Sequence, residues 1–178
     1  HVAAIAACFR PLAYGKDNAV APGVAVCPYE AGHTLGSASL ELRIDDGGTR
    51  RVVVFSGDLG PRNAPILRDS ACIAVRADLV ILETTYGDRD HRSLADTVKE
   101  FGELVGHAVE HGGKILVPTF AVGRAQSLLL LLQRLRNAGE LPLDVPIWLD
   151  SPMAEQATEL TVKHARLLRI SAAEARGL

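Results

Sequence analysis

The sequence predicts a mixed α/β fold in which a β-rich part precedes a part with alternating strands and helices. In residues 24–56, short apolar runs rich in valine are separated by turns that contain glycine. From Leu79 onward, short apolar runs alternate with segments of helical periodicity. That alternation is typical of a parallel sheet with helices packed on it. The change from one part to the other is expected just after residues 83–87.

The β-rich part is expected to begin with a short helix and a loop. The first nine residues show helical spacing of apolar side chains, and Pro11 ends the helix that they predict. Residues 14–23 contain Asp17-Asn18 and Pro22-Gly23, which indicate a loop. Strands are then predicted over residues 24–27, 38–44 and 51–55, with a turn at Asp45–Gly48 between the last two.

The second part opens with Leu79–Leu82, an apolar run short enough for a strand buried on both faces. Residues 94–108 then form an amphipathic helix, which Ser93 caps with Asp96 and which Gly112-Gly113 ends. The remaining expected elements are a strand at 115–117, a helix at 123–138, a strand at 146–149, a helix after the cap Ser151, and a short helix opened by Ser171 and Glu174.

Composition places the chain among ordinary globular proteins. It has 178 residues, of which 48% are hydrophobic and 22% charged, with a formal net charge of −2. The near-neutral balance gives no electrostatic footprint for nucleic acid, and an aromatic share of 4% predicts no extended platform for stacking bases. Any role with nucleic acid must therefore depend on a specific site.

The cysteines and termini bear on the compartment and on completeness. Cys8, Cys27 and Cys72 are odd in number and none lies in a Cys-x-x-Cys pair, so buried free thiols in a reducing compartment, the cytoplasm, are expected. No signal peptide or membrane-spanning run is recognisable. Because the chain starts with His1 and its single methionine is Met153, we expect an excerpt or a processed chain.

Polar clusters follow several predicted strands, at the sheet edge where ligands gather in α/β proteins. His33 lies between Gly32 and Gly36, exposed at a tight turn, where it either meets a metal or bonds to the backbone. Asp58 follows an apolar strand directly and either ligates a divalent cation or bonds within its own turn. Each interpretation stays open for each residue taken alone.

Glu83 ends a strand that is predicted to be buried, so its carboxylate needs a partner. That partner is a protonated histidine elsewhere in the chain, or Arg89 in a structural ion pair. Arg124 follows Gly123 at a strand-to-helix turn whose backbone N–H groups and guanidinium suit a phosphate, although a buried Arg124 that ties helix to sheet fits equally well. Ser151 follows Asp150 in a similar turn, and helix capping is its default role.

These clusters together resemble the β-CASP family of metallo-β-lactamase-fold nucleases, in its RNA-processing branch. The resemblance runs from about residue 10 to about residue 160 and rests on ordered segments. They are Ala31–Ser37 (Ala-Gly-His-Thr-Leu-Gly-Ser), Phe55–Gly60 (Phe-Ser-Gly-Asp-Leu-Gly), Glu83–His91 (Glu-Thr-Thr-Tyr-Gly-Asp-Arg-Asp-His), Pro118–Gln126 (Pro-Thr-Phe-Ala-Val-Gly-Arg-Ala-Gln) and Asp150–Ala154 (Asp-Ser-Pro-Met-Ala).

The resemblance implies a catalytic role for Asp58 and Glu83 in a site with two zinc ions. His33 is implied as a ligand to one zinc and Asp58 as the carboxylate that bridges both. Glu83 is implied as the acid that orients a histidine acting on the leaving group. The implied reaction is hydrolysis of an RNA phosphodiester by water activated on the metals. Whether cleavage is internal or from an end stays open.

The resemblance also implies the architecture. Residues 1–87 correspond to part of a metallo-β-lactamase αββα sandwich, and residues 88–178 to the first half of an inserted β-CASP parallel α/β domain. RNA is expected in the cleft between them, with Arg124, Gly123 and Ser151 as substrate-binding residues. A homodimer of the complete protein stays open, and no membrane partner is implied.

The chain departs from the family pattern in its histidines. The ligand run His-x-His-x-Asp-His is absent, and His1 does not match it. Two further family histidines are not supplied by the remaining ones, which are His91, His107, His111 and His164. A tetrahedral zinc site takes four ligands, so we expect the isolated chain to bind zinc weakly, to lack activity and to expose apolar surface. A non-catalytic RNA-processing scaffold and a hydrolase of another substrate are the alternative functions.

Overall fold

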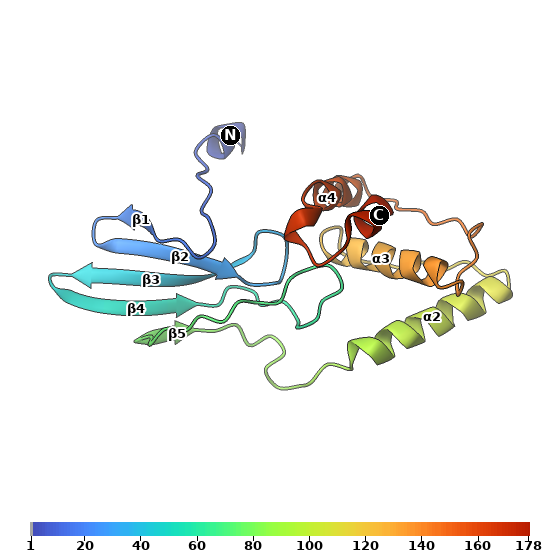
Figure 1. Cartoon of the computed structure of the whole chain (residues 1–178), viewed down its shortest axis with the longest axis horizontal. Helices are drawn as coiled ribbons and strands as arrows, with labels where there is room; N and C mark the ends of the chain where they lie inside the picture. The colour runs from blue at the N-terminus through green and yellow to red at the C-terminus, as the bar shows by residue number, and fades with distance from the viewer. Residues whose placement is uncertain (1) are drawn as a thin grey trace.

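The computed structural model describes residues 2–178, so His1 lies outside the described residues. Figure 1 shows a β-sheet at one side of the molecule and, apart from the short N-terminal helix, the helices at the other. The helices are α1 (Val2–Ala6), α2 (Leu94–Glu110), α3 (Arg124–Asn137), α4 (Pro152–Lys163), the 3-10 turn η1 (Ala165–Leu167) and α5 (Ala172–Arg176). The strands are β1 (Asn18–Ala21), β2 (Val24–Glu30), β3 (Ala38–Asp46), β4 (Thr49–Phe55) and β5 (Leu79–Ile81).

The sheet has five strands in the order β1-β2-β3-β4-β5. Its first four strands are antiparallel and joined by short connections, whereas β5 returns through a long connection to pair parallel with β4. The β3–β4 hairpin turns at Gly47 and Gly48, both with positive φ, as a two-residue hairpin loop requires. The expected turn at Asp45–Gly48 is confirmed, and Asp45 Oδ1 accepts a hydrogen bond from the Gly48 N–H at 3.1 Å.

A buried carboxylate lies in the middle of this sheet. Glu41 on β3 is 1% exposed and sits opposite Cys27 on β2. The Tyr29 hydroxyl donates to Glu41 Oε2 at 2.8 Å, and the Arg43 guanidinium donates to Glu41 Oε1 at 2.7 Å. The hydrogen bond to Glu41 raises the pKa of the Tyr29 hydroxyl. Both carboxylate oxygens of Glu41 are therefore paired, as burial demands.

Two apolar clusters hold the helical part together. In the first, Val105 of α2 meets Leu135 of α3 and Leu141. In the second, Ile66 from the connection after β4 packs with a group that lies on the helical side, namely Leu130, Leu168, Ile170 and Ala175. The Arg169 N–H donates to the Ile66 carbonyl at 2.8 Å. The connection between β4 and β5 therefore ties the sheet to the helices.

Helices α3 and α4 are joined through one buried side chain. Gln126, 1% exposed, donates from Nε2 to the carbonyl of Ala121, to the carbonyl of Ala154 and to Thr158 Oγ1, at 3.0, 3.3 and 3.0 Å. Its Oε1 accepts from the Gly123 N–H at 2.7 Å. One amide thus closes the start of α3 and fixes α4 against it.

The expected helix caps are confirmed. The Ser93 hydroxyl accepts from the Asp96 N–H, the Ser151 hydroxyl from the Ala154 N–H, and the Ser171 hydroxyl from the Glu174 N–H. Glu174 completes a reciprocal box by accepting from the Ser171 N–H. None of the helices within residues 2–178 is long and apolar enough to cross a membrane.

Several expectations about strands are wrong. Residues 18–21, expected as loop, form β1 because they pair with β2. Leu79–Leu82, expected to be buried on both faces, lies at a sheet edge with side chains about half exposed. Residues 115–117 and 146–149 form no strand in the described chain. Leu116 is 92% exposed and Trp148 87% exposed, and neither segment has a neighbouring strand in the described chain with which to form a β-ladder.

The parallel helix-covered sheet expected for residues 88–178 is therefore not formed, although mixed α/β character is confirmed. The exposed apolar surface that was expected is present, for instance at Phe120 and Met153. Of the three cysteines, Cys27 alone is buried, whereas Cys8 and Cys72 are exposed because they lie on the N-terminal segment and on the long connection. The division at residue 87 stays a prediction.

We expect Gln126→Ala to lower the free energy of unfolding by about 1–3 kcal/mol, since it removes the donor for acceptors on Ala121, which precedes α3, and on Ala154 and Thr158 of α4. Urea unfolding followed by circular dichroism measures the change. Gln156→Ala, at an exposed position of α4, is the matched control and should stay within about 0.5 kcal/mol. Equal effects of the two substitutions would show that the buried amide has no special role.

Candidate functional site

The loop that carries His33 begins where β2 ends. The Ser37 hydroxyl accepts hydrogen bonds from the N–H groups of His33 and Thr34 at 3.1 and 3.2 Å. The Ala31 N–H donates to the Ser37 carbonyl at 3.2 Å, which closes the loop at its base. These bonds satisfy the backbone N–H groups of the loop. The imidazole of His33 remains exposed at a tight turn, as the sequence predicted.

The loop that carries Asp58 begins where β4 ends, and Ser56 organises it. The Ser56 N–H donates to the Ile81 carbonyl at 2.9 Å, which continues the pairing of β4 with β5. The Ser56 hydroxyl accepts from the Glu83 N–H at 2.9 Å and donates to the Gly57 carbonyl at 2.7 Å. A single buried serine therefore places the Asp58 loop and Glu83 side by side at the same sheet edge.

The His33 and Asp58 loops touch backbone to backbone. The Gly60 N–H donates to the Ala31 carbonyl at 2.9 Å. A Cβ atom added to Gly60 would lie 1.7 Å from the Gly32 carbonyl oxygen, closer than any two non-bonded heavy atoms can come. Glycine at position 60 is thus required by this close approach, which sets the spacing of His33 and Asp58.

Three predicted residues meet at this edge. His33 Nε2 lies 3.8 Å from Asp58 Oδ2, with the side chains 46% and 81% exposed. Glu83 Oε2 accepts from the Thr85 N–H at 2.9 Å. Hydrogen bonds from the Thr85 N–H and hydroxyl hold the pKa of Glu83 below its usual range, assisted by the Leu59 N–H and by the nearby His33. The edge therefore offers an imidazole and two carboxylates to solvent.

The structural alternative for Glu83 is wrong. Arg89 does not pair with it but forms a two-point interaction with its own neighbour Asp88, at 2.9 and 3.1 Å. Glu83 also does not end a doubly buried strand, since β5 is at the sheet edge. Its carboxylate is stabilised mainly by the Thr85 donors of its own loop, with the Leu59 N–H and His33 from other loops adding to them.

The expected phosphate cradle at the start of α3 is wrong in one respect. The backbone N–H groups there already have acceptors: Gly123 donates to Gln126, Arg124 to the Val122 carbonyl, and Ala125 to the Phe120 carbonyl. The capping side chain of Gln126 explains why these amides are not open. The Arg124 side chain is exposed, so the alternative of a buried Arg124 is wrong as well. Among residues 2–178 it takes part in no ion pair.

Ser151 is half-buried at the start of α4, and its hydroxyl accepts from the Ala154 N–H at 3.2 Å. Capping accounts for this hydrogen bond.

A cavity of about 210 Å³ lies between the loop that follows β2 and the start of α3. Thr34 and Leu35, which follow His33, line one side of it, and Gly123, which precedes Arg124, lines another. Arg124 itself lines a second pocket together with Pro118, Thr119 and Phe120. The loop with the imidazole and the start of α3 therefore face a common space.

Sequence reasoning missed the residues that build the site. Ser37 and Ser56 were recognised only as members of motifs, although each orders one loop. Gly60 was likewise recognised as the end of the Phe55–Gly60 segment, whereas it allows another loop to approach. The sequence signal for Ser37, Ser56 and Gly60 was their position close to His33 or Asp58. The roles of Ser56 and Gly60 could not be predicted, because their contacts with Glu83 and Gly32 join residues far apart in the chain.

The chain resembles several curated proteins over most of its length. It is 42% identical over 160 residues to ribonuclease TTHA0252 of Thermus thermophilus. It is 32% identical over 160 residues to transcription termination factor FttA of Methanococcus maripaludis. It is 34% identical over 134 residues to cleavage and polyadenylation specificity factor 73 of Drosophila melanogaster.

These alignments include 90%, 89% and 75% of this chain, and 34%, 24% and 19% of the three relatives. The chain thus spans about a third or less of the length of these relatives. No family model matches the chain. The relatives and the ordered motifs agree, and the chain belongs to the β-CASP family of metallo-β-lactamase-fold RNA-processing nucleases.

Proposed function

We propose that the chain contributes to a zinc-dependent RNA phosphodiester hydrolase. The observation that carries the proposal is the meeting of His33, Asp58 and Glu83 at one sheet edge, from three separate loops. The names of the relatives, a ribonuclease and a cleavage factor among them, support RNA as the substrate. The cytoplasm remains the proposed compartment.

The donor set fits zinc. Zinc binds imidazole nitrogen and carboxylate oxygen at about 2.0–2.2 Å, so two ligands of one ion lie no more than about 4.3 Å apart. The 3.8 Å between His33 Nε2 and Asp58 Oδ2 satisfies that limit. In this proposal His33 would be a ligand to one of two zinc ions and Asp58 would be a carboxylate ligand shared by both. A bound zinc pair supplies Lewis-acid activation and neutralises charge on the phosphate.

The remaining roles belong to the chain itself. Glu83, held ionised by the Thr85 hydrogen bonds, is proposed to orient a catalytic histidine by accepting its N–H. The exposed Arg124 is proposed to hold RNA phosphate with its guanidinium alone, because the neighbouring amides have other acceptors. Gly123 sets the turn that presents Arg124, and Ser151 is proposed as a further contact to RNA.

Two ligands do not complete a four-coordinate zinc site. We therefore propose that residues 1–178 alone lack activity and bind zinc weakly at His33 and Asp58. A non-catalytic scaffold is the second candidate function, but the joint presence of His33, Asp58 and Glu83 at one edge disfavours it. Homodimerisation stays a proposal for the complete protein.

The function is tested with the product of the entire reading frame that encodes this chain, assayed on end-labelled single-stranded RNA with zinc. Asp58→Asn is expected to reduce cleavage at least about 100-fold, since a bridging ligand should exceed the effect of an outer-shell residue. Asp78→Asn provides a control carboxylate outside the proposed site, because it accepts from the Val52 N–H instead. Absence of cleavage by the full product, or cleavage that survives Asp58→Asn, would reject the proposal.

Gly60→Ala is expected to force the His33 and Asp58 loops apart, because its Cβ would overlap the Gly32 carbonyl. The free energy of unfolding of the 178-residue chain should fall by about 1–3 kcal/mol, as for overpacking in general. Urea unfolding measures it. The matched control is Gly106→Ala in α2, where an added Cβ meets no atom within 4 Å and where alanine favours the helix by about 0.5–1 kcal/mol. Unchanged stability of Gly60→Ala would disprove the close contact.

The carboxyl of Glu83 is expected to titrate below its ordinary pKa of 4.5. Thr85→Val removes the hydroxyl donor but keeps the backbone donor, so it should move the midpoint part of the way back, as seen by NMR of the carboxyl carbon. Because the pKa is lower in the folded chain, ionised Glu83 stabilises the fold above its unfolded pKa, and this stabilisation is lost as the pH falls through the folded pKa. A Glu83 midpoint at or above 4.5 would contradict the hydrogen-bond arrangement.

A further inference from the structure

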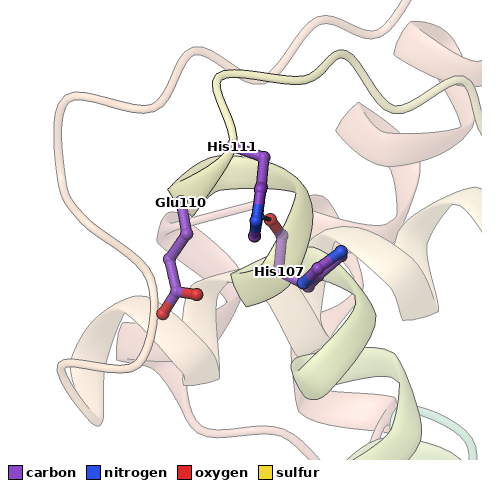
Figure 2. Close-up of side chains that lie close together, drawn as sticks. All are labelled: His107, Glu110 and His111. Atoms are coloured by element: carbon purple, nitrogen blue, oxygen red, sulfur yellow. Dashed lines mark hydrogen bonds between the residues drawn. The ribbon is translucent and has the colours of Figure 1, made fainter.

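The last turn of α2 carries a group of side chains that the proposed hydrolase site does not use. Glu110 and His111, the residue that caps α2, follow His107 by three and four residues, so each lies next to His107 at the end of the helix. Figure 2 shows the three side chains around the end of the helix. One ligand atom from each lies within 4.8 Å of the others, and all three residues are exposed. Among residues 2–178, no other group of three such side chains is arranged this closely.

The hydrogen bonding of His111 prepares it as a ligand. Its Nδ1 lies 2.8 Å from the His107 carbonyl oxygen. A carbonyl can only accept, so Nδ1 carries a proton, and in the neutral imidazole that a metal binds the lone pair then lies on Nε2. Metal-binding histidines in proteins commonly donate their other ring N–H to a backbone carbonyl in this way, which fixes the tautomer and the ring orientation. The geometry of His111 is therefore that of a histidine whose Nε2 is free to bind.

The position on the helix favours a cation. The carboxyl end of a helix carries a partial negative charge from carbonyls without intrahelical partners. The two imidazole rings lie with their centroids 4.2 Å apart and tilted by 44°, so both nitrogens can turn toward a shared point. Glu110 adds a carboxylate beside them. A cation there would meet two imidazole nitrogens, a carboxylate oxygen and the favourable end of the helix dipole.

We propose that His107, Glu110 and His111 form a surface site for a divalent transition-metal ion of the zinc class. Imidazole and carboxylate together suit zinc and its borderline-soft neighbours better than magnesium or calcium, which prefer oxygen ligands alone. The ligand atoms already lie within 4.8 Å of one another, close to the limit of about 4.3 Å for two ligands of one zinc ion, and the exposed side chains can rotate to meet that limit. Three protein ligands leave a fourth position to water or to a group from another molecule.

The site is separate from the edge that holds His33 and Asp58, and it does not depend on the proposed hydrolase function. It also changes what a zinc titration of this chain means. With two ligands at one place and three at another, the stronger zinc binding of the isolated chain belongs to α2.

The test is isothermal titration of the 178-residue chain with zinc chloride in a non-chelating buffer. One equivalent per chain is expected, with a dissociation constant below about 1 mM. His107→Ala and His111→Ala should each weaken it at least about 10-fold, and Glu110→Gln should weaken it less. Glu103→Gln, an exposed glutamate on the same helix, is the matched control and should have no effect. Helicity by circular dichroism checks that each variant still folds.

Two results would overturn the proposal. One is the absence of any zinc binding by the unaltered chain at concentrations up to about 1 mM, which corresponds to roughly −4 kcal/mol or weaker. The other is binding that persists in His107→Ala/His111→Ala but disappears in His33→Ala, which would assign the ion to the sheet edge instead. NMR gives an independent reading, since zinc should shift the His111 Nε2 resonance and leave that of His164 unchanged.

Discussion

The close approach of the loops after β2 and β4 is the constraint on which the candidate site depends. Strands β2 and β4 are not neighbours, because β3 lies between them. Their carboxyl ends can therefore supply side chains to one point only if the following loops cross the end of β3. The hydrogen bond from Gly60 to the Ala31 carbonyl makes that crossing, and the missing side chain of Gly60 allows it. Ser56 then adds the third loop by accepting from the Glu83 N–H.

The same segment also joins the sheet to the helices. After Gly60 the chain runs to Ile66, which packs with Leu130 and Ile170, and to Asp69, whose carboxylate pairs with Arg169 at 3.0 Å. Such an exposed ion pair contributes little by itself, so apolar packing at Ile66 is the main attachment. Because the cavity beside Thr34 and Gly123 is lined by Ile66 as well, packing here also sets how the start of α3 faces the His33 loop.

Local signals in the sequence predicted local structure well. Ser93, Ser151 and Ser171 cap helices as expected, because a capping hydroxyl needs only the next turn of its own chain. The β3–β4 hairpin follows from Asp45–Gly48 for the same reason. The residues at the sheet edge could be nominated from their places after strands. Their mutual distances could not, since these arise from contacts between segments about 27 residues apart, such as Ser56 and Glu83.

Strands were the elements for which sequence reasoning failed. An apolar run such as residues 115–117 indicates that a segment is suited to a sheet. It forms a strand only if a neighbouring strand pairs with it, and the described chain has no such strand there. Conversely, residues 18–21 carry turn signals yet become β1 because β2 offers an edge. The amides at the start of α3 were misjudged because the capping role of Gln126 depends on Ala154 and Thr158 of another helix.

Glu41 gives the sheet a means of selecting its own alignment. Facing directions alternate along a strand, so sliding β3 by one residue against β2 would turn this carboxylate to the opposite face and part it from Tyr29. A misaligned sheet would then lose the hydrogen bond from Tyr29 to the carboxylate, whereas the Arg43 interaction would move with β3 because both residues lie on that strand. Buried Glu41 thus favours the native register of β3 against β2. Because β3 also pairs with β4, this register determines where the ends of β2 and β4 lie.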